Sequence, residues 1–202
     1  MSLRVNPKFI LNVFVEDYDA LIWTDYGKQI VVGGRVALLD VSDTITVSDP
    51  ELQGLLRAGW EQQVRDADAA LLVYSITSRE SFLRLTALSD AMFAIPAAGG
   101  GARGSGANVG GAPESQRARP IQISLVGNKS DLNIDREVAA REGVELAERL
   151  GCGFVETSAK TAYNVDEVFR GLVRGLVRAV DEDATEEREE PAAKHPLSLE
   201  AI

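Results

Sequence analysis

Residues 125–131 read Leu-Val-Gly-Asn-Lys-Ser-Asp, an apolar run that ends in a polar tetrad. A short continuous apolar run is typical of a strand that is buried on both faces of a parallel sheet. In open α/β sheets, ligands bind at the carboxyl ends of the strands, and the tetrad falls at such an end. This stretch therefore predicts both the class of the fold and the place of a binding site.

The rest of the chain alternates strand patterns with helical patterns. Gly33-Gly34 separates two apolar runs and suits a two-residue hairpin. The expected strands cover 28–32, 35–41, 69–76, 121–126 and 153–157, and the expected helices cover 78–94, 136–150 and 164–181. The alternation predicts an α/β fold with a mostly parallel sheet and helices on both of its faces.

Two segments fall outside this pattern. Residues 95–120 are rich in glycine and alanine without periodicity, which predicts a flexible insertion. Residues 181–202 are acidic and then proline-rich, which predicts a disordered tail. We therefore expect one domain over 1–180, followed by that tail.

Composition excludes several classes of function. The formal net charge is −10, which disfavours binding to nucleic acid or to an anionic membrane surface. Cys152 and His195 are the only cysteine and histidine, so neither a disulfide framework nor a Cys/His zinc site fits one chain. The sequence has no secretory leader and no apolar stretch long enough to span a bilayer, so we expect a cytoplasmic protein.

The tetrad has the chemistry for reading a guanine base. The carboxylate of Asp131 only accepts hydrogen bonds, and guanine offers two adjacent donors that adenine cannot match. The apolar stem of Lys129 can lie along the base with its charged head in water. About 25 residues later, residues 154–160 read Phe-Val-Glu-Thr-Ser-Ala-Lys, again at the end of a predicted strand.

Both motifs, in this order and at this spacing, resemble the Ras branch of the small GTPases. The resemblance covers roughly 9–94 and 121–180, and it implies a three-layer fold like that of the P-loop NTPases, GTP or GDP as the ligand, and a role in signal transduction. It also implies that the Ala159 N–H meets the carbonyl oxygen of guanine. The residues that it assigns to the nucleotide are Asn128, Lys129, Asp131, Ser158, Ala159 and Lys160. Protein effectors or regulators would contact the switch-like regions 15–30 and 43–65.

The sequence departs from that family at the phosphate side. It contains no Gly-x-x-x-x-Gly-Lys-Ser/Thr loop, and the match begins after the position where the first strand and this loop are expected. The switch I threonine position holds Leu21, with Thr24 three residues on. Asp43-Thr44 continues as Ile-Thr-Val, without the glutamine that orients the attacking water. Asp43 is the one candidate ligand for Mg²⁺, and it is equally explained as an acid at the end of a strand. The chain therefore resembles a GTP hydrolase without the parts that hydrolysis needs.

These departures leave several hypotheses open. In the family sheet the first strand lies in the centre. One hypothesis is that residues 9–15 form a strand that fills its place, and the other is that the chain is an incomplete gene product. For function, the alternatives are a truncated or degenerate Ras-type GTPase, a pseudo-GTPase interaction module without nucleotide cycling, and an unrelated α/β binding domain. The acidic tail lacks a prenylatable cysteine, so peripheral membrane association is implied by the resemblance alone.

Overall fold

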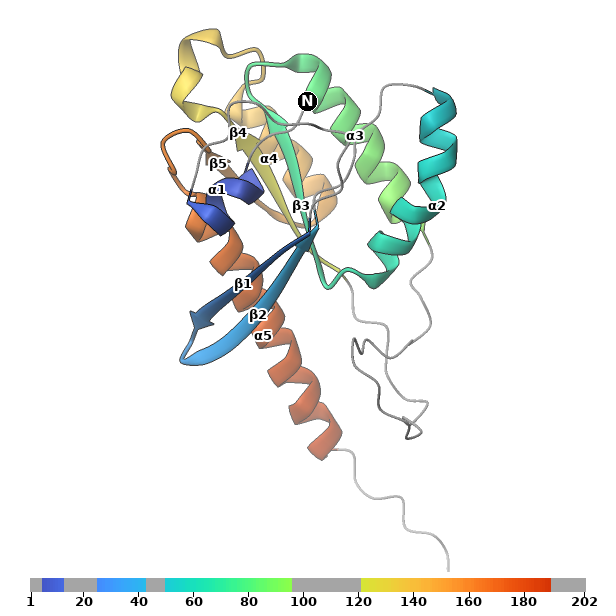
Figure 1. Ribbon diagram of the computed structural model, residues 1–202, viewed down its shortest axis with the longest axis vertical. Helices are drawn as coiled ribbons and strands as arrows, with labels where there is room; N and C mark the ends of the chain where they lie inside the picture. Colours follow the sequence, from blue (N-terminus) through green and yellow to red (C-terminus); the bar gives the residue numbers. More distant parts are fainter. Residues whose placement is uncertain (1–4, 13–24, 43–49, 96–120, 190–202) are drawn as a thin grey trace, which may run out of the picture.

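The computed structural model describes residues 5–12, 25–42, 50–95 and 121–189 (Figure 1). The strands are β1 (Asp25–Val32), β2 (Arg35–Ser42), β3 (Ala69–Ser75), β4 (Gln122–Asn128) and β5 (Gly153–Thr157). The helices are α1 (Val5–Leu11), α2 (Pro50–Asp66), α3 (Arg79–Phe93), α4 (Ala140–Leu150) and α5 (Val165–Glu189), with a 3₁₀ helix η1 (Ser130–Asp135) after β4.

A parallel three-stranded sheet in the order β3-β4-β5 forms the centre of the molecule. All three strands were predicted, β3 and β4 from their apolar runs, and the parallel pairing is confirmed. The register aligns Ser75 with Asn128, and Asn128 with Thr157, at the carboxyl ends of the strands. The polar tetrad and the 156–160 segment therefore start from neighbouring strands at one edge of the sheet.

The predicted hairpin is confirmed, because β1 and β2 pair antiparallel across Gly33-Gly34. Both glycines have positive φ, 58° and 78°, which the tight turn requires and which other residues rarely adopt. The hairpin forms a sheet of its own, so in the described part of the chain the strands form two sheets rather than one. Among the described residues β3 is therefore an edge strand of its sheet.

Helices cover both faces of the three-stranded sheet, as predicted. Successive residues of a strand point to opposite faces, and β3 follows this rule. Leu72 and Tyr74 belong to a core shared with α2, α3 and α4. Leu71 and Val73 pack on the other side, against a second core built from α1, α5 and the hairpin. This layering positions the carboxyl ends of the strands between helix N-termini.

The hypothesis that 9–15 forms a strand is wrong for the part that the structure describes, because residues 9–11 lie in α1. Tertiary contacts hold this segment in place. The ring of Phe9 stacks on Phe169 of α5 with centroids 3.8 Å apart, and the Lys28 ammonium lies over its face. Phe9 is thereby buried, and residues 13–15 lie outside the described residues.

Two predicted helix limits also differ from the structure. α5 continues to Glu189, so the start of the predicted tail, 181–189, is helical. Its sequence is rich in glutamate, a good helix former, and it extends a helix that the core already holds. α4 begins at Ala140 rather than 136, because the N–H groups of Glu137 and Val138 donate to the Ile76 carbonyl rather than within a helix. Ser78 caps α3, since its side chain accepts the Ser81 N–H at 3.2 Å.

Candidate guanine-binding site

Asn128 is the structural centre of the predicted site. It ends the middle strand of the sheet and is 2% exposed. Its Oδ1 accepts the Thr157 hydroxyl at 3.2 Å and the Ala159 N–H at 3.0 Å. Both partners are buried, so these bonds join the loop after β4 to the loop after β5 without access to water.

Asp131 is held by the second loop. It is exposed on η1, and its Oδ1 accepts the Ser158 hydroxyl at 2.6 Å. Ser158 is fully buried and its Oγ also accepts the Thr161 N–H at 3.1 Å, so its hydroxyl hydrogen is directed to Asp131. Among the described residues no hydrogen bond to Oδ2 of Asp131 is found, and the residue is exposed.

Lys129 turns the chain between the strand and η1. Its φ is 69°, the left-handed conformation, and its carbonyl accepts the Leu132 N–H at 2.9 Å. Non-glycine residues rarely adopt this conformation, and when they do the surrounding structure enforces it. The turn brings Asp131 back beside Ser158. Lys160 lies on the opposite loop and is exposed.

The Ala159 N–H is not free to meet a guanine carbonyl in the way that the resemblance implies. It donates to Asn128, and Ala159 is 3% exposed. A base carbonyl at this position would have to share the N–H or replace Asn128 as its acceptor. The sequence predicted that Asn128 and Ala159 belong to one site, but not the hydrogen bond between them.

A half-buried ion pair joins the segment after η1 to β5. Arg136 follows η1 and binds both carboxylate oxygens of Glu156, at 2.6 and 2.9 Å. The same guanidinium donates to the Asn133 side chain at 2.8 Å and to the Val138 carbonyl at 3.1 Å. Hydrogen bonding to Glu156 raises the pKa of Arg136. This pair was missed from the sequence, where a salt bridge over 20 residues leaves no local signal.

The residues that the resemblance relates to the phosphates and to Mg²⁺ lie outside the described residues. This holds for Asp43, Leu21 and Thr24, and for residues 15–24 and 43–49 of the switch-like regions 15–30 and 43–65. Within the described ranges no group of three or more His, Cys, Asp or Glu side chains is arranged to hold a metal ion. The helices that the structure describes include none that is long and apolar enough to cross a membrane.

Comparison with known proteins agrees with this geometry. A family model described as "Ras family" matches residues 4–95 and 112–178. "Ras-like protein B" of Aspergillus fumigatus is 41% identical over 169 residues, which cover 82% of this chain and 68% of that protein. The chain belongs to the Ras family. "Protein ras-2" of Neurospora crassa is 39% identical, with 82% of this chain and 69% of that protein covered. "Ras-like protein 1" of Saccharomyces cerevisiae is 37% identical, covering 85% of this chain and 47% of that protein.

Membership of the Ras family fixes the fold and the general class of function. Ras-family proteins are GTP-binding signalling proteins with the P-loop GTPase fold, and the parallel β3-β4-β5 sheet between helix layers is part of that fold. The residues predicted for guanine all lie on the two loops at the carboxyl ends of β4 and β5, which is where ligands of such folds bind.

Proposed function

We propose that this chain binds guanine nucleotides through the loops after β4 and β5 and serves in Ras-type signal transduction. The observation that supports this most is the Ser158–Asp131 bond of 2.6 Å, together with the two bonds of Asn128. They present one carboxylate at the surface, on a frame of hydrogen bonds that joins the two loops. Preorganised groups bind more tightly because less freedom is lost on binding.

The carboxylate of Asp131 has the acceptors that guanine needs. The ring N–H and the exocyclic amine of guanine would both donate to it, and each such bond to a charged group is worth about 1.5–3 kcal/mol. The apolar stems of Lys129 and Lys160 would lie along the base. Adenine has no donor pair on that edge, so the site would select guanine by leaving the wrong base unpaired.

The proposal also covers the affinity for nucleotide and the rate of GTP hydrolysis. The 202 residues contain no phosphate-cradling loop motif. Losing three or four charge-assisted bonds costs roughly 5–10 kcal/mol, or several decades of affinity. We therefore expect this polypeptide to bind the base weakly and to hydrolyse GTP slowly or not at all, as a truncated or degenerate member of its family does.

A pseudo-GTPase interaction module is the second candidate. The observation that favours it is that the two base-side loops are joined directly by their own hydrogen bonds, which need no nucleotide as a bridge. Such a module would bind protein partners without a nucleotide cycle. A melting temperature that is unchanged by millimolar GDP and GTP would favour the module, and a GDP-dependent rise would favour the nucleotide-binding protein.

The test of base recognition uses GDP and IDP, which differ only in the exocyclic amine. We expect the chain to prefer GDP by about tenfold or more, because one charge-assisted bond separates the two. Asp131→Asn should remove most of this preference, since an amide offers one donor where the base needs only acceptors. Asp135→Asn, the same change at the far end of η1, should keep it. Equal GDP preference in both variants would contradict the proposal.

A further inference from the structure

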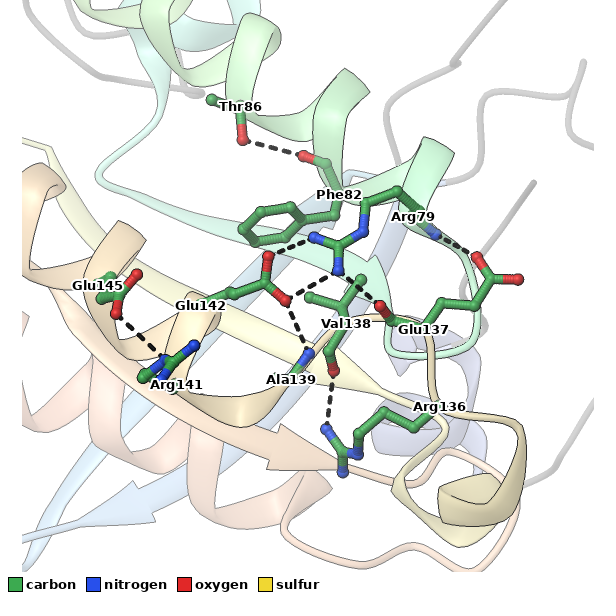
Figure 2. A network of polar contacts seen from close by, with 10 residues as sticks. All are labelled: Arg79, Phe82, Thr86, Arg136, Glu137, Val138, Ala139, Arg141, Glu142 and Glu145. Atoms are coloured by element: carbon green, nitrogen blue, oxygen red, sulfur yellow. Dashed lines mark hydrogen bonds and ion pairs between the residues drawn. The ribbon is translucent and has the colours of Figure 1, made fainter.

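Arg79, at the start of α3, contacts two glutamates that follow η1 (Figure 2). Its guanidinium binds both carboxylate oxygens of Glu142, with Nη2 2.9 Å from Oε2. Nη2 also donates to the Glu137 carbonyl at 2.6 Å, and the Arg79 backbone N–H donates to the Glu137 carboxylate at 2.7 Å. One residue of α3 therefore fixes the backbone and the side chains of the segment between η1 and α4. We call this set of contacts the Arg79 clamp.

The clamp is directional and permanently charged. A planar guanidinium that binds a carboxylate through two parallel bonds defines the orientation of both groups. Glu142 also accepts the Ala139 N–H at 3.0 Å. The hydrogen bonds from Arg79 and from this backbone N–H lower the pKa of Glu142 from 4.5 to about 2. Glu142 is thereby ionised throughout the physiological range.

The segment that the clamp fixes is joined to the guanine-binding loops. The Glu137 and Val138 N–H groups both donate to the Ile76 carbonyl, at 2.9 and 3.0 Å. The Ile76 N–H donates in turn to the Asn128 carbonyl at 3.0 Å. On its other side the Val138 carbonyl accepts from Arg136, which binds Glu156 near the end of β5, just before the second loop.

η1 itself has no anchor in the core. None of its residues is buried, so its position depends on where its two ends are held. The N-terminal end follows Asn128 and carries Asp131. The C-terminal end, Asp135, is followed by Arg136 and then by Glu137. An element of six residues without a buried side chain opens easily unless both ends are fixed.

We propose that Arg79 is a positioning residue of the guanine site, which holds the C-terminal end of η1 through Glu137 and Glu142 and so keeps Asp131 oriented toward the base. This inference rests on the proposed guanine binding. The ion pair is partly exposed, with side-chain exposures of 42% and 29%, so its effect on global stability is small. Its effect is instead local, because it orients the Asp131 carboxylate, and hydrogen bonds to a base depend on that orientation.

The test compares Arg79→Met, which removes the charge and keeps the stem, with Arg79→Lys, which keeps the charge and loses the two parallel bonds. Arg84→Met is the matched control, because Arg84 also lies on α3 and binds an acid of that same helix, Glu80, at 2.6 Å. Three quantities are measured in the full chain: amide hydrogen exchange without ligand, equilibrium affinity for GDP, and urea unfolding.

We expect Arg79→Met to accelerate exchange of the Glu137 and Val138 amides about tenfold and to weaken GDP binding roughly 2- to 30-fold. Arg79→Lys should fall between it and the wild type, and Arg84→Met should change neither quantity. Unchanged exchange in Arg79→Met overturns the inference. Faster exchange with unchanged GDP affinity overturns it too, because the clamp is then only structural. If the wild type fails to bind GDP while exchange still accelerates, the proposed function fails and the positioning of η1 stands.

Discussion

Removing the Asn128 side chain should cost far more stability than an ordinary surface substitution. In Asn128→Ala the Ala159 N–H and the Thr157 hydroxyl lose their common acceptor, at positions that are 3% and 0% exposed. The Thr157 hydroxyl can rotate toward another acceptor, but the backbone N–H cannot. A buried donor without a partner costs about 1–3 kcal/mol, and each lost hydrogen bond contributes about 1 kcal/mol. We therefore expect Asn128→Ala to lower the free energy of unfolding by about 2–4 kcal/mol, a large share of the 5–15 kcal/mol typical of a domain.

Urea unfolding at equilibrium measures this loss, with Asn133→Ala as the matched control. Asn133 is an exposed residue of η1 whose Oδ1 accepts from Arg136 at 2.8 Å, so its loss leaves no buried donor behind. It should cost less than about 1 kcal/mol. The slope of the unfolding line should be equal in both variants, since neither changes the surface exposed on unfolding. If the two variants lose the same stability, the assembled frame around Asn128 is refuted.

Three further predictions concern the cores and the Arg79 clamp. The pKa of Glu142 is lowered from 4.5 to about 2, chiefly by its hydrogen bond from Arg79. The stability difference between wild type and Glu142→Gln should therefore be complete above about pH 5 and be lost as the pH falls through 4.5 toward 2, measured by urea unfolding at several pH values. The Tyr74 hydroxyl is buried without a hydrogen-bond partner among the described residues, and burial raises its pKa to about 12. Tyr74→Phe should raise stability by about 1 kcal/mol, and the wild type should weaken relative to it as the pH rises from 10 to 12; equal or lower thermal stability of the variant would contradict this. Gly143→Ala should destabilise by about 1–3 kcal/mol, although alanine favours helices, because its Cβ would lie 2.5 Å from an aromatic ring of β5. Gly171→Ala, on α5 with its nearest side-chain atom at 4.0 Å, should instead be neutral or stabilise by up to about 1 kcal/mol in the same denaturation assay.

Most of the sheet could be predicted from the sequence because its signals are local. The Gly33-Gly34 pair and the apolar runs of β3 and β4 each specify a strand or a turn without reference to the rest of the chain. The neighbouring positions of the two guanine motifs followed from the same signals, since parallel strands end at one edge. The helix at 5–11 could not be predicted, because it depends on the stacking of Phe9 on a residue 160 positions away.

The candidate site was predicted as a set of residues but not as a structure. The sequence indicated that Asp131 and Ser158 belong to one site, but not that one hydroxyl directs the carboxylate. The Arg136–Glu156 pair and the Arg79 clamp were missed because each joins loops that are distant in sequence and carries no motif of its own. Long-range polar contacts of this kind depend on the completed fold.

The most direct test of base recognition is an equilibrium titration of the 202-residue chain with GDP and with ADP, followed through the backbone amide resonances. We predict that GDP shifts the amides of 128–131 and of Ala159 and binds at least about tenfold more tightly than ADP, because only guanine satisfies both oxygens of Asp131. Equal affinity for the two nucleotides, or shifts confined to other parts of the chain, would contradict the claim that these two loops read guanine.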